Sequence, residues 1–266
     1  SGDHVVLHWL KSQGIESGPP RYTWSGKPLN AGLIATFNEY AIVSENRVTP
    51  VDTTFDMEVA SLFGCAVTTG FGVVENNAKI KLGESVVVFG AGGVGLNIAQ
   101  AANLLSAYPI IALDLHDDRL KLAKKFGATH TINSNKNNAK AMIREILKDK
   151  DVDVFIDNTG QPAIIEMGYE LTGPKGRVVL VGVPRKGNAI NIYSLPLHFG
   201  KTISGSHGGE TIPHEDISRY QKLFDAGRIQ LKPLITDHFK LEEINTAIQK
   251  MRNGEIAGRC LIKMDN

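Results

Sequence analysis

Val86-Val87-Val88-Phe89-Gly90-Ala91-Gly92-Gly93-Val94-Gly95 is the stretch that decides the fold. Its first four residues form a continuous apolar run, which is typical of a strand buried on both faces of a sheet. The next six residues fit the pattern G-x-G-x-x-G, and a helical pattern runs from Val94 to about Leu105. A glycine-rich turn between a strand and a helix is the context that indicates dinucleotide binding.

Each glycine of the turn has a separate task in this interpretation. Gly90 allows the tight turn, Gly92 lets the backbone approach a pyrophosphate, and Gly95 lets the helix pack on the strand. Gly93 belongs to the same turn, and the helix that begins at Val94 offers its free N–H groups and partial positive charge to the diphosphate. We therefore expect this turn to bind the cofactor.

Asp114 follows the second predicted strand, Pro109–Leu113, and lies 19 residues after Gly95. A carboxylate at this place accepts hydrogen bonds from both ribose hydroxyls of NAD and repels the extra phosphate of NADP. The alternative is an aspartate that merely caps the helix beginning near His116. Arg119 could serve a 2′-phosphate, but we expect NAD because Asp114 occupies the strand end itself.

The rest of the middle region alternates strand and helix patterns. Further strands are expected at 130–132, 152–156, 177–181 and 201–204, with helices at 117–126 and near 138–149. Six strands with helical crossovers predict an α/β fold with a doubly wound parallel sheet. Residues 1 to about 54 indicate turns and antiparallel strands, such as Phe37–Val43, and the tail predicts helices around 214–226 and 241–253.

Bulk properties narrow the function classes. The 266 residues suit one or two domains, and a net charge of +1 gives no reason to expect nucleic acid or an anionic membrane as partner. No apolar run approaches the roughly 20 residues that span a bilayer. The two cysteines, Cys65 and Cys260, lie far apart, so we expect no disulfide framework and a cytoplasmic protein.

Several segments together resemble the zinc-containing medium-chain alcohol dehydrogenases over nearly the whole chain. They are Gly64–Gly72, Val88–Gly95, Phe126–Thr129, Val181–Pro184 and Gly254–Arg259. The resemblance implies a partial GroES-like, β-rich catalytic domain at 1–66, a Rossmann NAD-binding domain at 67–207, and a segment at 208–266 that returns to the catalytic domain.

The resemblance also implies roles for single residues. Cys65 is similar to the third protein ligand of a catalytic zinc, although a small buried hydrophobe is the alternative. Thr69 and Val94 resemble residues that press on the nicotinamide ring. The remaining implied contacts are the adenosine ribose for Asp114 and Arg119, the carboxamide for the backbone of Val181, Val183 and Ser206, and the pyrophosphate for Arg259. The alternative for Arg259 is a solvated surface charge.

Two departures from the family pattern concern zinc. A catalytic zinc needs about three protein ligands, and the family's other cysteine and histidine ligands lie before the point where this chain begins. His8, His116 and His207 do not obviously substitute, because none of them forms a ligand-spaced pair. Many relatives carry four close cysteines after the Gly-Asp opening, whereas Lys11–Pro20 has none. We expect a truncated chain with no structural zinc and, at most, weakly held catalytic zinc.

The resulting hypothesis is an NAD-dependent oxidoreductase that transfers a hydride between an alcohol or aldehyde and the coenzyme, with this chain inactive by itself. We expect a homodimer or a dimer-based tetramer that joins sheet edges, with Ala189–Tyr193 supplying part of the edge. One alternative is a non-catalytic NAD-binding module. Another is a zinc-free quinone or enone reductase, against which Asp114 and Cys65 both count.

Overall fold

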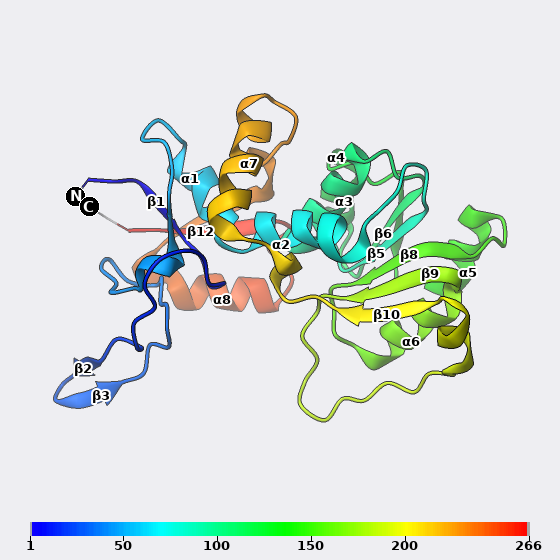
Figure 1. Ribbon diagram of the computed structural model, residues 1–266, viewed down its shortest axis with the longest axis horizontal. Coiled ribbons are helices and arrows are strands. Elements are labelled where there is room, and N and C mark those ends of the chain that lie inside the picture. Colours follow the sequence, from blue (N-terminus) through cyan, green and yellow to red (C-terminus); the bar gives the residue numbers. More distant parts are fainter. Residues whose placement is uncertain (1, 265–266) are drawn as a thin grey trace. The chain divides into compact units, whose positions relative to one another are not determined.

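Six parallel strands form one sheet, in the order β10-β9-β8-β5-β6-β7 (Figure 1). In chain order they are β5 (Val86–Phe89), β6 (Ile110–Asp114), β7 (His130–Asn133), β8 (Val152–Asp157), β9 (Thr172–Leu180) and β10 (Thr202–Gly205). The chain crosses from one half of the sheet to the other between β7 and β8, so the two halves meet where β5 lies beside β8. This is the order of a doubly wound dinucleotide fold. The computed structural model, which describes residues 2–264, thus confirms the expected α/β architecture.

The sheet belongs to a compact unit formed by Thr69–Glu210, which we call unit 2. Its helices are α3 (Gly93–Leu104), α4 (Asp117–Lys125), α5 (Ala139–Leu147) and α6 (Pro162–Leu171), and it also contains most of α2 (Ala66–Gly72), which continues as a π-helix over Val73–Ala78. Alternate residues of a strand point to opposite faces, and Val86 and Val87 are both fully buried, so both faces of the sheet are covered.

Local sequence signals set the ends of these helices. The Asn138 side chain accepts a hydrogen bond from the backbone N–H of Ala141, at 3.1 Å, and so caps the start of α5. Pro162 occupies the first position of α6, where its missing N–H costs nothing. Gly127 has φ of +102° just after α4 and provides the expected stop.

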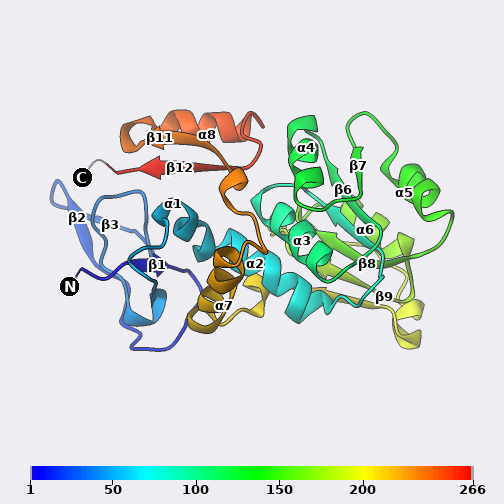
Figure 2. The ribbon, with the colours of Figure 1, turned by 90° about the horizontal axis from the view of Figure 1, so that it is seen from above.

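The residues before and after unit 2 form unit 1. Its strands are β1 (Val5–Leu7), antiparallel to β4 (Val48–Pro50), the hairpin of β2 (Tyr22–Trp24) and β3 (Lys27–Leu29), and β11 (Ile235–Lys240), parallel to β12 (Arg259–Lys263). Its helices are α1 (Met57–Ala60), α7 (Pro213–Asp225) and α8 (Ile244–Arg252). Helices α7 and α8 correspond to the two helical patterns expected in the tail. Figure 2 shows α8 beside β11 and β12.

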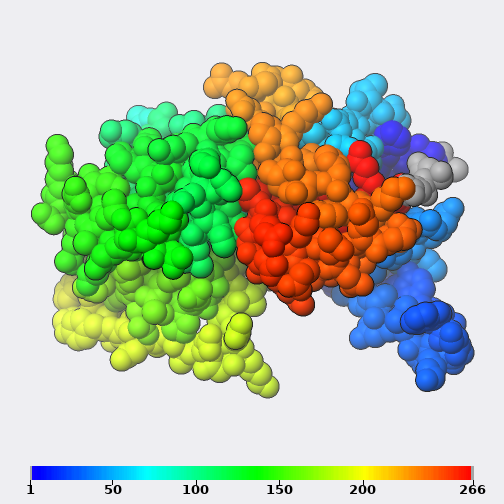
Figure 3. Space-filling view, turned by 180° about the vertical axis from the view of Figure 1, so that it is seen from behind, coloured from blue at the N-terminus to red at the C-terminus, as the bar shows by residue number. Residues whose placement is uncertain are grey.

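One expected strand is wrong. Phe37–Val43 has an irregular backbone, and Phe37, Tyr40 and Ile42 are 62%, 88% and 68% exposed. The segment has a β-like composition, but none of the described strands pairs with it. Its Ile42 N–H donates instead to the Tyr22 hydroxyl, at 2.9 Å. In Figure 3, the darker blue residues low in the view protrude from the rest of unit 1.

None of the single helices in residues 2–264 is long and apolar enough to cross a membrane. Met57–Gly64 and Ala66–Ala78 meet a criterion of length and composition only when the two are counted together as a bent pair.

Candidate coenzyme site

Most of the expected site residues lie at one edge of the sheet. Because the strands are parallel, their carboxyl ends meet at the same edge, where ligands bind in open α/β folds. Gly90 follows β5, Asp114 ends β6, Val181 follows β9 and Ser206 follows β10. The structure therefore brings together residues that are spread over more than a hundred positions of the sequence.

The backbone geometry of the turn requires glycine at two positions, independently of any ligand. Gly90 has φ of +96°, a conformation that side-chain-bearing residues rarely adopt. A Cβ on Gly95 would lie 2.0 Å from the carbonyl oxygen of Gly90, so α3 can approach the turn only with glycine there. A Cβ on Gly92, by contrast, would meet nothing within 4 Å. Gly92 thus borders open space, as expected of a residue kept small for a ligand.

Helix α3 begins at Gly93, with Gly92 as its N-cap. The first N–H groups of a helix, here those of Gly93, Val94 and Gly95, have no carbonyl partner inside the helix. The Gly92 cap has no side chain to receive them. These donors and the helix dipole fit the diphosphate of a dinucleotide.

Asp114 links the second strand to the glycine turn. Its buried carboxylate accepts a hydrogen bond from the Ala91 N–H to Oδ2, at 2.8 Å, and from the His116 N–H to Oδ1, at 3.1 Å. The N-cap of α4 is His116, so Asp114 does not cap that helix. A carboxylate oxygen can accept two bonds, so each retains capacity for a ribose hydroxyl. A guanidinium nitrogen of Arg119 lies 3.7 Å from Oδ2.

Thr69 lies beside the start of α3. A Cβ on its neighbour Gly70 would fall 2.5 Å from the Cβ of Asn97 and 3.0 Å from the carbonyl oxygen of Val94. Glycine at 70 therefore lets α2 approach α3 closely. Thr69 and Val94, the two residues expected to press on the nicotinamide, lie on these two helices at their contact.

Sequence reasoning missed Asp157, at the end of β8. Its fully buried carboxylate accepts hydrogen bonds from the Thr159 N–H (2.9 Å), the Thr159 hydroxyl (2.6 Å) and the Gly160 N–H (2.8 Å). Its carbonyl oxygen also accepts from the N–H groups of Val181 and Gly182. Asp157 thus fixes two turns at the carboxyl edge. A polar residue directly after the predicted strand 152–156 was the signal that could have revealed it.

A hollow of about 540 Å³ opens next to these turns. Its lining residues include Thr159, Gly160 and Val183. A Cβ on Gly160 would lie 2.7 Å from the carbonyl carbon of Val183, so the two turns pack closely there. Ser206 joins the same edge because its N–H donates to the carbonyl of Leu180 at 2.8 Å. Backbone hydrogen bonds therefore hold Val181 and Ser206 at strand ends, and the Val183 backbone packs against Gly160.

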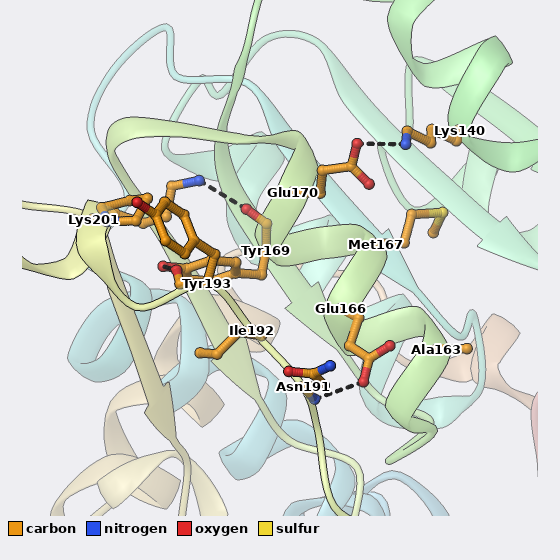
Figure 4. A pocket seen from close by; sticks show the side chains of 11 residues that line it. Lys140, Ala163, Glu166, Met167, Tyr169, Glu170, Asn191, Ile192, Tyr193 and Lys201 are labelled. Carbon is orange, nitrogen blue, oxygen red and sulfur yellow. Dashed lines mark hydrogen bonds and ion pairs between the residues drawn. The ribbon is translucent and has the colours of Figure 1, made fainter.

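A second hollow of about 570 Å³ contains none of the expected coenzyme residues (Figure 4). Its polar groups bind one another: Lys201 donates to the Tyr169 carbonyl at 2.8 Å, and Lys140 pairs with Glu170 at 2.5 Å. Burial lowers the pKa of Lys201, although Asp151 opposes this effect. Because Lys201 donates to a carbonyl of the last turn of α6, it stabilises the end of that helix.

Cys65 and Arg259 belong to unit 1. Cys65 is exposed, lies between two helical segments and forms no disulfide, and its exposure argues against the alternative of a small buried hydrophobe. Arg259 is half-buried and begins β12. Among residues 2–264, no group of three or more His, Cys, Asp or Glu side chains could hold a metal ion. The described side chains therefore do not fit a catalytic zinc.

The loop Lys11–Pro20, which contains no cysteine, is held by polar contacts. Glu16 accepts from the Asn46 amide at 2.8 Å and from the buried Arg47 guanidinium at 3.1 Å, and its carboxylate lies 3.1 Å from the Lys11 ammonium. The hydrogen bonds from Asn46 and Lys11 lower the pKa of Glu16 to about 2. An anionic Glu16 thus organises this loop.

Comparison with known proteins agrees with the geometry. Residues 93–226 match the family model described as zinc-binding dehydrogenase. The chain is 32% identical to an alcohol dehydrogenase of Malus domestica over 94% of its own length and 67% of that relative. It is also 32% identical to an S-(hydroxymethyl)glutathione dehydrogenase of Escherichia coli O1:K1, over 94% of this chain and 69% of the relative.

Solved structures give the same result. Benzyl alcohol dehydrogenase from Acinetobacter calcoaceticus is 33% identical with a TM-score of 0.78, over 84% of this chain and 61% of that one. Alcohol dehydrogenase TADH from Thermus sp. ATN1 is 26% identical with a TM-score of 0.71, over 82% and 61%. The chain thus spans about two thirds or less of these relatives. From its strand order, its glycine turn and these matches, the chain belongs to the zinc-binding dehydrogenase family.

Proposed function

We propose that this chain binds NAD(H) at the carboxyl edge of its parallel sheet, as the coenzyme-binding part of an oxidoreductase acting on an alcohol or aldehyde. The observation that carries the proposal is the Asp114 carboxylate, which is tied to the glycine turn through the Ala91 N–H. An acid in that position favours two ribose hydroxyls over a 2′-phosphate. When bound, the nicotinamide supplies the hydride chemistry.

The residues of the chain would divide the work of binding. The N–H groups at the start of α3 would receive the diphosphate, with Gly92 leaving room for it. Asp114 would orient the ribose, assisted by Arg119. We assign Thr69 and Val94 to the nicotinamide face, and the backbone of Val181, Val183 and Ser206 to its carboxamide. Arg259 is assigned to the pyrophosphate on family resemblance.

Calorimetric titration with NADH and NADPH tests the proposal. NADH should bind more tightly, because a 2′-phosphate would approach the Asp114 carboxylate. The Asp114→Ser variant should narrow the preference, while Asp118→Ser, which changes an exposed acid on α4, should leave it unchanged. Tighter binding of NADPH to the wild-type chain would refute the role of Asp114.

A second candidate function is coenzyme binding without catalysis. The absence of three clustered ligands in residues 2–264 favours it, because Cys65 alone cannot hold a catalytic zinc. We expect no detectable alcohol oxidation by the 266-residue chain, measured as NADH appearance with zinc supplied. Turnover comparable to that of a relative spanning the full family length would overturn this candidate.

We also propose that two copies associate along β10. This strand lies at an edge of the sheet, and its Thr202, Ser204 and Gly205 are exposed. An exposed edge favours pairing with another strand. Ala189–Tyr193, expected to supply part of the edge, has an irregular backbone in the single chain. Sedimentation should show a dimer at micromolar concentration, and a monomer at that concentration would overturn the proposal. A cytoplasmic location remains part of the proposal, since neither Cys65 nor Cys260 forms a disulfide.

A further inference from the structure

The turn that follows Ser206 has an uncommon backbone. Gly208, Gly209 and Glu210 have φ of +65°, +74° and +46°, so three successive residues are left-handed. Glycine adopts this conformation freely, but glutamate does so only where its surroundings hold it. The observed strain at Glu210 therefore calls for a physical cause.

The turn is closed by two reciprocal side-chain contacts. The Ser206 hydroxyl oxygen accepts from the Gly209 N–H at 3.0 Å, and the Glu210 carboxylate accepts from the His207 N–H at 3.0 Å. The Gly209 contact runs from the turn back to Ser206, the residue assigned to the carboxamide. The side chains at the two ends of the turn, those of Ser206 and Glu210, thus each bind a backbone N–H near the opposite end. A capping box at a helix start has the same reciprocal arrangement.

Two neighbouring asparagines anchor the same turn from the π-helix Val73–Ala78. The Asn76 amide donates to the carbonyl oxygens of Gly209, at 2.8 Å, and Glu210, at 3.3 Å. The Asn77 amide donates to the Glu210 carboxylate. A π-helical segment is uncommon and is often found at functional sites. The asparagine contacts thus connect the turn to the π-helix that continues α2.

The turn also touches α2 directly. A Cβ on Gly209 would lie 2.8 Å from the carbonyl oxygen of Thr69. Thr69 is the residue assigned to the nicotinamide face. Ser206 and Thr69, although 137 positions apart, are thus parts of one tightly connected piece of unit 2.

We propose that Glu210 and Asn76 are positioning residues, which lock the 206–210 turn so that Ser206 and Thr69 stay correctly placed for the nicotinamide end of the coenzyme. The inference rests on the proposed function. The strain at Glu210 is then the consequence of a carboxylate that must reach both the His207 N–H and the Asn77 amide. Neither residue need touch the coenzyme.

The test compares NADH with ADP-ribose, which lacks the nicotinamide. Glu210→Ala and Asn76→Ala should each weaken NADH binding about tenfold, equivalent to about 1.4 kcal/mol, and leave ADP-ribose binding unchanged. Glu210→Gln keeps an acceptor for the His207 N–H and should restore part of the affinity. Glu145→Ala, an exposed glutamate on α5, is the matched control and should change neither ligand.

The outcomes separate the two proposals. If the wild-type chain binds neither ligand, the proposed function fails. If wild type binds NADH more tightly than ADP-ribose but the variants alter neither affinity, or weaken both equally, the positioning role is wrong. Should Glu210→Ala not fold, Glu210→Gly decides, because it removes the carboxylate while relieving the left-handed strain.

Discussion

Replacing Gly95 by alanine tests whether the glycine turn and α3 are packed as the structure shows. The new Cβ would lie 2.0 Å from the Gly90 carbonyl oxygen, about 1.4 Å short of the 3.4 Å at which ordinary contact begins. The obstacle is backbone, and this carbonyl also accepts from the Asn158 amide at 3.3 Å, so relief requires moving the turn or the helix. Overpacking of this kind costs about 3 kcal/mol, at the upper end of its usual range.

The matched control is Gly92→Ala in the same turn. Its Cβ would meet nothing within 4 Å, and its φ of −76° suits alanine. Loss of a glycine N-cap should cost at most about 1 kcal/mol. The added methyl group would nevertheless occupy the space that we assign to the diphosphate, so NADH should bind at least about tenfold more weakly, a loss of about 1.4 kcal/mol.

Thermal unfolding by circular dichroism, with NADH titration of each folded variant, separates the two effects. Gly95→Ala should lower Tm by about 6–12 °C, and Gly92→Ala by no more than about 4 °C. A Gly95→Ala variant that melts like wild type would refute the packing argument. A Gly92→Ala variant that binds NADH normally would instead refute the ligand role of the turn.

Three further predictions concern other parts of the chain. Asp157→Asn should lower the free energy of unfolding in urea by about 1.5–3 kcal/mol, because it leaves a buried N–H without its charged acceptor; an unchanged midpoint would contradict this. Hydrogen bonds from Asn46 and Lys11 lower the pKa of Glu16 from 4.5 to about 2, so its stabilising contribution is complete above pH 4.5 and is lost as pH falls toward 2. In the Glu16→Gln variant, Tm should therefore depend less on pH between these two values. An equally steep fall of Tm with pH in the variant would contradict the role of Glu16. Elemental analysis should find well under one tightly held zinc per chain, with no change in Cys65→Ser; stoichiometric zinc would reveal ligands that the described residues do not bring together.

Patterns that act over short distances were readable from the sequence. Val86–Phe89 forms β5 because a strand buried on both faces is apolar throughout, and the following glycines mark the turn at which α3 begins. The position of Asp114 at the end of β6 follows from the same local periodicity. Phe37–Val43 shows the limit of such reasoning, because its residues favour a strand but its pairing depends on a neighbour.

The sequence alone therefore determined the fold class, a doubly wound parallel sheet, together with the glycine turn and the acid expected to select NAD. Tertiary structure alone decided which distant residues support them. The Asn76 amide donates to the Gly209 carbonyl across 133 positions, next to Glu210 with its left-handed φ of +46°. The role of Asp157 in joining two turns likewise appears only once β8 and β9 are paired. The physical reason is that periodicity and turn chemistry are local properties of the chain, whereas a hydrogen bond between remote side chains exists only after the sheet has brought its strand ends together.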